Sequence, residues 1–185
     1  MGFLLWIIAG LLIAGTIVYR SARRTRQLLP RIELPGDERL PATLLQRYAG
    51  RTLLVVVLLT VLAATMVMYH GPQVWWTSDP VRLTVTLVLL AALVAYLVFT
   101  LRIRKLEARG DGSIDERDLA IMRGSYAGVG GAMMTVVVVW MIALTEGYSD
   151  TGLVPTYYLY LVFWSCVMTN VIASIAGILL AYRRD

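Results

Sequence analysis

Two short motifs contain the residues of this sequence that are best able to do chemistry. Asp37-Glu38-Arg39 and Asp115-Glu116-Arg117 each place two carboxylates beside a guanidinium. Such groups could bind a metal ion or a phosphate, so an enzyme acting on lipid head groups is one hypothesis. A simpler interpretation exists for the second motif, because Ser113 and Glu116 have the spacing of a helix capping box. We therefore expect helix starts here, with a docking surface for a partner or ligand as the alternative.

The two motifs belong to a longer pattern that predicts an internal repeat. Tyr48-Ala49-Gly50 follows the first motif and Tyr126-Ala127-Gly128 follows the second, with the same offset of 78 residues. We predict two parallel helical-hairpin repeats, at about 1–70 and 79–147, followed by one extra helix at 156–182. The repeated residues form a cytoplasmic box, for docking or helix capping: Asp37, Glu38, Arg39, Tyr48, Asp115, Glu116, Arg117 and Tyr126.

Other catalytic and metal-binding arrangements are missing from the sequence. His70 is the only histidine and Cys166 the only cysteine, so the sequence contains no His/Cys metal motif and no internal disulfide. We predict no catalytic residue, no metal site and no cofactor, and a protein that is not an enzyme.

The chain is far more apolar than a soluble domain. Hydrophobic residues make up 58% and charged residues 16%, with a mean hydropathy of +0.70, whereas soluble domains carry about 25% charged residues. Five segments lack Asp, Glu, Lys, Arg and His, and each is long enough to cross the ~30 Å hydrocarbon layer. Helices satisfy their own backbone hydrogen bonds in lipid. We therefore predict an all-α polytopic membrane helical bundle whose five transmembrane helices lie at about 2–19, 52–69, 83–101, 127–145 and 156–182.

The basic residues alternate from loop to loop and predict the orientation. Loop 20–51 holds eight arginines and loop 102–126 holds six Lys or Arg residues, whereas loops 70–82 and 146–155 contain only Arg82. The positive-inside rule places the N-terminus outside and the C-terminus inside. The net charge of +5 then reflects orientation, and we expect no nucleic-acid partner.

Small and polar residues concentrate in the last apolar segment. Asn170 is the strongest buried polar candidate, and we expect it to make an interhelical hydrogen bond. A helix-packing stripe recurs at intervals of four residues, which permits close approach of helix backbones. Its members are Ser165, Thr169, Ala173, Gly177 and Ala181.

Aromatic residues gather at the ends of the apolar segments. Trp75 and Trp76 lie in the first outer loop, and Tyr157, Tyr160 and Trp164 lie at the start of the last segment. Such rings favour the headgroup layer, so we expect interfacial belts rather than an aromatic binding site.

Residues 110–184 carry a resemblance to a known group of proteins. Asp115-Glu116-Arg117-Asp118 is followed by Ile121, a span, a short outer loop and a tyrosine-rich span that ends in Tyr182-Arg183-Arg184. This order resembles small uncharacterised prokaryotic membrane proteins in which an Asp-Glu-Arg box precedes a transmembrane hairpin. The resemblance implies a multi-pass protein of the prokaryotic cytoplasmic (inner) membrane and no particular activity. The duplicated box and the fifth span depart from the four-span form of that group.

These features together predict a non-enzymatic integral membrane protein. We expect an accessory or assembly subunit of a membrane complex, whose partners are the lipid bilayer and other membrane subunits or further copies of the chain. The alternative is a small homo-oligomeric channel or transporter lined by Ser, Thr and Asn.

Overall fold

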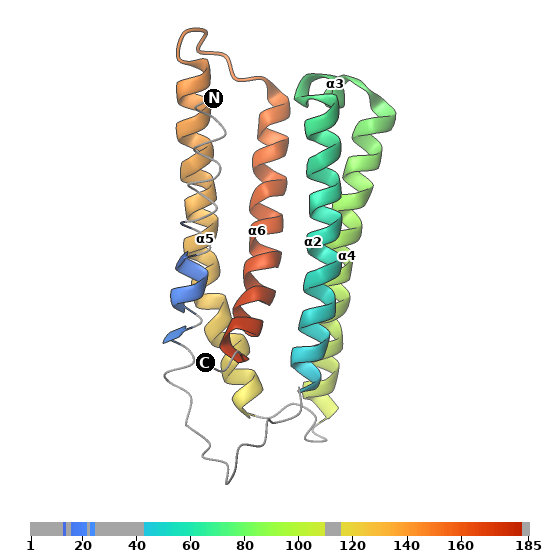
Figure 1. Ribbon diagram of the computed structural model, residues 1–185, viewed down its shortest axis with the longest axis vertical. Helices are drawn as coiled ribbons and strands as arrows, with labels where there is room; N and C mark the ends of the chain where they lie inside the picture. Colours follow the sequence, from blue (N-terminus) through green and yellow to red (C-terminus); the bar gives the residue numbers. More distant parts are fainter. Residues whose placement is uncertain (1–12, 14–15, 22, 25–42, 110–115, 183–185) are drawn as a thin grey trace.

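The structure, a computed structural model, describes residues 13, 16–21, 23–24, 43–109 and 116–182, and its elements are all helices. Four long helices run up and down the molecule, and a short helix joins the first two of them at one end (Figure 1). The elements are α2 (Leu44–His70), α3 (Pro72–Thr77), α4 (Asp79–Arg109), α5 (Glu116–Tyr148) and α6 (Thr156–Tyr182).

The four long helices are each long and apolar enough to cross a membrane. Even the shortest, with 27 residues, extends over about 40 Å at 1.5 Å per residue, which exceeds the ~30 Å hydrocarbon layer. The prediction of helices for the last four apolar segments is confirmed. The first predicted span, 2–19, lies mostly outside the described residues, so five spans stay a prediction.

Helices α2 and α5 begin before their apolar segments. The Thr43 hydroxyl accepts a hydrogen bond from the Gln46 amide at 3.2 Å, which caps the start of α2. Helix α5 begins at Glu116, and Glu116 and Asp118 occupy its first turn, where the helix dipole favours acidic side chains. Ser113, the other half of the predicted capping box, lies outside the described residues.

Helix α3 replaces part of the loop that we predicted over 70–82. Gly71, with φ of +77°, makes the turn that ends α2, and Pro72 opens the new helix, a position that proline favours. Six residues are too few for a periodic apolar pattern, which is why the sequence did not reveal this helix.

Arg82 fastens α3 to the start of α4. Its Nη1 donates to the Trp76 carbonyl oxygen at 3.0 Å and its Nη2 lies 2.5 Å from Asp79 Oδ1. Its guanidinium also lies 5.3 Å from the centroid of the Trp76 ring. The one basic residue of the predicted outer loops is therefore used within the fold.

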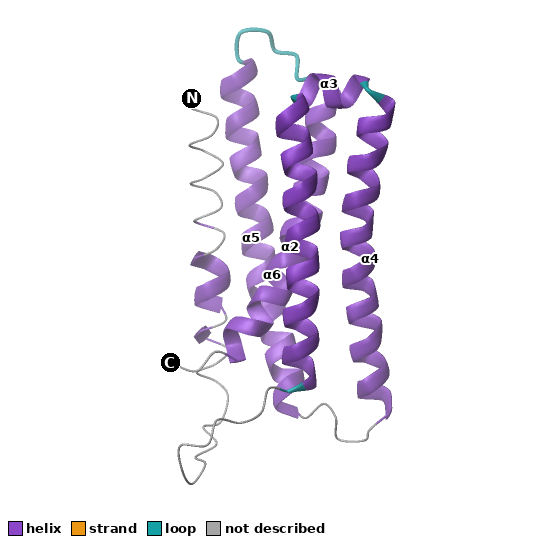
Figure 2. Cartoon of the chain, turned by 45° about the vertical axis from the view of Figure 1, so that its right-hand side comes forward, coloured by secondary structure: helices purple, strands orange, loops and turns teal. Residues whose placement is uncertain are grey.

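The long helices lie in the order α5, α6, α2, α4. The extensive interfaces join α5 to α6, α6 to α2 and α2 to α4, and Figure 2 shows α4 and α5 on opposite sides of the bundle. The hairpins of the fold are thus α2–α4 and α5–α6. The predicted repeat instead groups the spans of α4 and α5, and it stays a prediction about the sequence.

Two clusters of buried residues hold the bundle together. The larger one lies between α2, α4 and α6 and includes Val56, Phe99 and Ile175. The smaller one joins Val18 to Ala132 of α5 and Ala173 of α6, together with Val129. The described residues of the N-terminal segment therefore pack against the α5–α6 hairpin.

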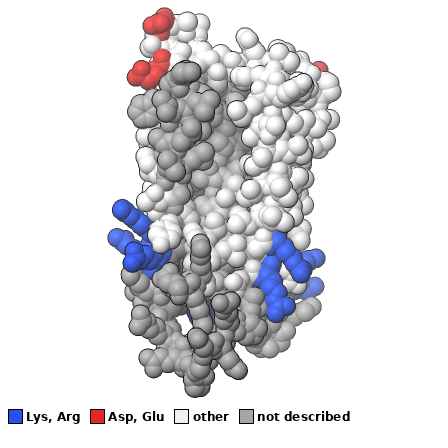
Figure 3. Space-filling view, in the orientation of Figure 1, with Lys and Arg blue, Asp and Glu red and all other residues white. Residues whose placement is uncertain are grey.

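Charged residues are segregated along the bundle. Within the described part of the chain, each Lys or Arg other than Arg82 lies at 20–24, near the starts of α2 and α5, or near the end of α4. Figure 3 shows blue side chains on this face towards the end of the molecule opposite α3, and red side chains at the other end. The charge pattern read from the loops is therefore also a pattern in space.

The orientation can be tested by cysteine labelling in a Cys166→Ser background. Thr151 and Ala108 are both exposed, at opposite ends of the bundle. We expect an impermeant maleimide to label Thr151→Cys in intact right-side-out membranes, and to label Ala108→Cys only after the membranes are opened. The background protein without a new cysteine is the control. Labelling of the two sites in the reverse order would contradict the predicted topology.

Candidate functional site

The structure describes half of the predicted cytoplasmic box. Asp37, Glu38, Arg39 and Asp115 lie outside the described residues. The other four members stand at the end of the bundle opposite α3, on two helices: Tyr48, Glu116, Arg117 and Tyr126.

The two tyrosines of the box both contact α4. The Tyr48 ring lies under the Arg102 guanidinium, 5.9 Å away, and Tyr126 of α5 lies within hydrogen-bond reach of Tyr96. The repeated tyrosines therefore help to hold the ends of the helices together. Glu116 is exposed, whereas Arg117 is half-buried.

A buried carboxylate next to the box links α5 to the end of α6. Asp118 is only 3% exposed, and its Oδ1 accepts a hydrogen bond from the Tyr182 hydroxyl. A carboxylate at this depth needs such donors, because burial without them is costly. This contact between Asp118 and Tyr182 was not predicted from the sequence.

The predicted helix-packing stripe lies largely against α5. Ser165 Oγ accepts a hydrogen bond from the Trp140 indole at 2.8 Å, and Ala173 belongs to the cluster shared with α5. At Gly177, an added Cβ would lie 3.1 Å from Ser125 Cβ, which leaves almost no room for a side chain. Ala181 is buried in the larger cluster instead.

Two glycines of α5 allow a second close approach, to the N-terminal segment. An added Cβ at Gly128 would lie 2.7 Å from Ser21 Cβ, and one at Gly131 would lie 2.9 Å from Ile17 Cγ2. Only a residue without a side chain fits such separations. Small residues on α5 thus admit another helical segment on the side away from α2.

The hydroxyl groups within the long helices are mostly bonded to their own helix. Ten of them donate to the carbonyl oxygen four residues earlier, at 2.7–3.0 Å, which satisfies the hydroxyl without a partner helix. The ten donors are Thr52, Thr60, Thr65, Thr84, Thr86, Thr100, Ser125, Thr135, Thr145 and Ser174.

Asn170 follows the same local pattern. Ser174 Oγ lies 2.7 Å from the Asn170 carbonyl oxygen and 3.5 Å from Asn170 Oδ1. Both contacts are within α6. Among the described residues, this local contact takes the place of the interhelical hydrogen bond that we predicted.

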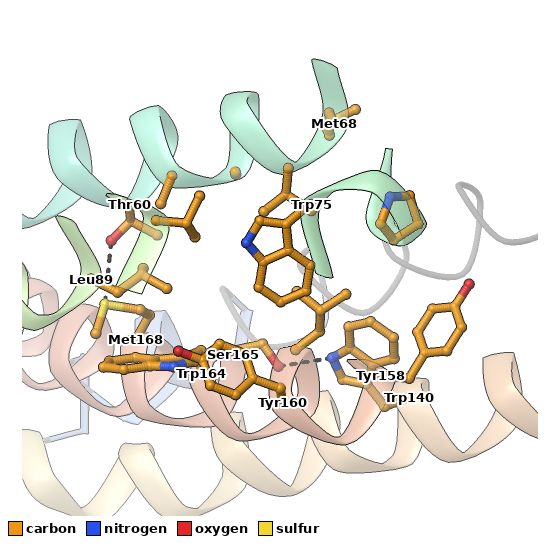
Figure 4. A pocket seen from close by; sticks show the side chains of 16 residues that line it. Thr60, Met68, Trp75, Leu89, Trp140, Tyr158, Tyr160, Trp164, Ser165 and Met168 are labelled. Atoms are coloured by element: carbon orange, nitrogen blue, oxygen red, sulfur yellow. Dashed lines mark hydrogen bonds between the residues drawn. The ribbon is translucent and has the colours of Figure 1, made fainter. Parts of the chain in front are cut away.

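An aromatic cavity of about 360 Å³ lies near the α3 end of the bundle (Figure 4). This volume is in the range of small-molecule sites. Residues from all five helices line it, and most of them belong to α2 and α6. The wall includes Thr60, Ala64, Met68, Trp75, Leu89, Trp140, Tyr158, Tyr160, Trp164, Ser165 and Met168.

The aromatic side chains of the wall contact one another. The Tyr160 ring lies 5.6 Å from the Trp75 ring and 6.2 Å from the Trp164 ring, between centroids, distances at which aromatic pairs attract. The Tyr160 hydroxyl is 2.7 Å from Thr86 Oγ1, which holds the ring in place from α4. We expected these residues to form an interfacial belt, but Trp75 is fully buried and Trp164 is 9% exposed.

Two hydrogen-bond donors of this wall have no partner among the described residues. They are the buried indole nitrogens of Trp75 and Trp164. An unsatisfied buried donor costs about 1–3 kcal/mol. The third indole of the wall, that of Trp140, donates to Ser165.

A comparison of the chain with protein-family models, curated proteins and solved structures finds no match. Within the described chain, no group of three or more His, Cys, Asp and Glu residues is placed to hold a metal ion. The places of the described chain best suited to bind another molecule are the aromatic cavity and the charged end opposite α3.

The close approach at Gly177 predicts that alanine substitutions at Gly177 and at Gly130 change the stability of the protein differently. Gly177→Ala should lower the free energy of unfolding in detergent by about 1–3 kcal/mol, because its methyl group meets Ser125 and overpacks the interface. Gly130 is the matched control, since an added Cβ there meets nothing within 4 Å. Gly130→Ala should leave stability unchanged or raise it by up to about 1 kcal/mol. Equal losses for the two variants would contradict tight packing at Gly177.

The contact between α5 and the end of α6 predicts that the Tyr182 hydroxyl stabilises the protein. Tyr182→Phe removes a donor from the buried Asp118 carboxylate and should destabilise the protein by about 1–3 kcal/mol. Tyr69→Phe is the control, because the Tyr69 side chain is 85% exposed. Thermal unfolding in detergent measures both. No difference between the two variants would mean that the hydrogen bond contributes nothing to stability.

Proposed function

We propose that this chain is a non-enzymatic integral protein of a prokaryotic cytoplasmic membrane and an accessory or assembly subunit of a larger membrane complex. In this proposal five helices cross the membrane, with the N-terminus outside and the C-terminus inside. One contrast carries this proposal. The apolar segments of the long helices contain no Asp, Glu, Lys, Arg or His, whereas the end of the bundle opposite α3 is charged and exposed.

The interior of the described bundle offers little to a transported ion or solute. The four apolar segments of α2, α4, α5 and α6 contain no Asp, Glu, Lys, Arg or His, although transporters usually place such groups in the membrane. Most hydroxyls there donate to their own helix. These contacts favour a subunit over the alternative, a channel lined by Ser, Thr and Asn.

The end opposite α3 has the character of a docking surface. Arg102, Arg104 and Lys105 are exposed at the end of α4. Together with Tyr48 of α2, Arg102 and Lys105 border a shallow pocket of about 160 Å³. A basic surface of this kind suits an acidic segment of a partner protein at the cytoplasmic face, since complementary charge steers association.

The proposal is tested by purification in mild detergent with matched charge reversals. We expect foreign membrane subunits to copurify with the chain in a fixed ratio. In an Arg104→Glu/Lys105→Glu variant, the amount of these subunits that copurifies should fall about tenfold or more. Glu146→Lys/Asp150→Lys reverses two exposed charges at the other end and should retain them fully. A pure homo-oligomer, or equal loss in both variants, would overturn the proposal.

The channel alternative has its own measurement. Purified protein in liposomes is expected to give no ion or solute flux beyond that of empty liposomes. Flux that appears with the native chain and disappears with Asn170→Leu would favour the channel in place of the subunit.

A further inference from the structure

The aromatic cavity has the depth of one membrane leaflet. Its wall on α2 begins at Thr60, and the helix from Thr60 to its end at His70 rises about 15 Å. The hydrocarbon layer is ~30 Å thick, so this is about half of it. Pro72 and Trp75 of α3 also line the cavity. A molecule in the cavity therefore lies alongside the lipids of the leaflet at the α3 end.

The cavity is a groove whose floor is α6 and whose sides come from different helices. Ala64 and Met68 of α2 line it and are exposed at the same time, and Trp140 of α5 lines it from the other side of α6. Exposed lining residues on a helix that spans the membrane face lipid. An acyl chain of a membrane lipid can therefore enter the groove from the side.

The polar groups of the wall are nearly all used within the protein. Thr60 Oγ1 lies 2.8 Å from the Val56 carbonyl oxygen and 3.4 Å from Met168 Sδ. Ser165 Oγ and the Trp140 indole bond to each other, and the Tyr160 hydroxyl bonds to Thr86. The two donors left over are the indole N–H groups of Trp75 and Trp164. The cavity therefore has two unpaired hydrogen-bond donors in a wall that is otherwise largely apolar.

This combination selects among possible occupants. A buried water needs two to four polar partners, which two separated donors in an apolar wall do not provide. An apolar face of another helix keeps its carbonyl groups in its own backbone hydrogen bonds and offers no acceptor. An ester lipid brings apolar chains and carbonyl oxygens that accept without requiring a donor in return. Lipid also surrounds the side of the bundle on which the groove opens.

We infer that the cavity binds one ester-linked phospholipid from the leaflet at the α3 end. One acyl chain lies along α6, and the ester carbonyl oxygens accept hydrogen bonds from the Trp75 and Trp164 indoles after a small rotation of these rings. The site requires only that the helices span the membrane, so it is independent of the subunit role proposed above.

The test compares two phospholipids that have the same head group and chain lengths. One has ester linkages and the other has ether linkages, which lack the carbonyl acceptors. The full-length protein is reconstituted with an equal mixture, extracted in mild detergent and analysed by native mass spectrometry for the lipid it retains. We expect enrichment of the ester lipid by about three- to tenfold, the value of one to two net hydrogen bonds.

Removal of the two indole donors should abolish this preference. In a Trp75→Phe/Trp164→Phe variant the ratio of ester to ether lipid should fall to about one. Trp76→Phe is the matched control, because Trp76 does not line the cavity, and it should keep the native ratio. The ratio is measured on protein that carries lipid, so a lower yield of folded variant does not affect it.

A second pair of variants tests occupancy of the groove itself. Ala64→Trp places a large side chain in the cavity and should reduce total retained lipid several-fold, whereas Ala91→Trp, at an exposed alanine of α4 outside the cavity wall, should not. A native ratio of one, a ratio unchanged in the double variant, or retention of another molecule or a second copy of the chain in place of phospholipid would overturn the inference.

Discussion

The close approach of α6 to α5 at Gly177 is the contact on which the rest of the bundle depends. In lipid, apolar side chains gain little by leaving their surroundings, so helices associate through van der Waals contact and a few hydrogen bonds. Helix α6 meets both conditions, with Ser125 of α5 against Gly177 and the Trp140 indole bonded to Ser165. Its other side packs on α2. The two hairpins are joined mainly through this one helix.

The same solvent explains where polar chemistry occurs. Most hydroxyls inside the long helices donate to their own backbone, as Thr100 does at Tyr96. A few side-chain hydrogen bonds join different helices within the bundle, such as those of Trp140 with Ser165 and of Tyr160 with Thr86. Others lie near the ends. Arg82 fastens α3 at one end, and Tyr182 meets the buried Asp118 at the other. Binding functions are accordingly expected at the two ends and in the aromatic cavity near α3.

The cavity depends on how α3 is held. Gly71 permits the turn that brings Trp75 back over the bundle, and Arg82 anchors the neighbouring Trp76 carbonyl oxygen. Trp75 then meets Tyr160 of α6, and the two belong to the wall of one cavity. A site for a lipid therefore arises from residues that first serve to close the end of the α2–α4 hairpin.

The sequence by itself determined the helical class and the positions of four helices that are long and apolar enough to cross a membrane, because lipid requires long uncharged segments that satisfy their own backbone hydrogen bonds. It also pointed to the stripe that includes Gly177, since small residues at intervals of four share one face of a helix. Only the tertiary structure decided that Trp75 and Trp164 are buried, that Asn170 contacts Ser174 of its own helix among the described residues, and that α6 lies between α5 and α2. Periodicity states which residues share a face. It does not state which helix that face meets, because many helix pairings satisfy the membrane equally well, and side-chain packing alone distinguishes them.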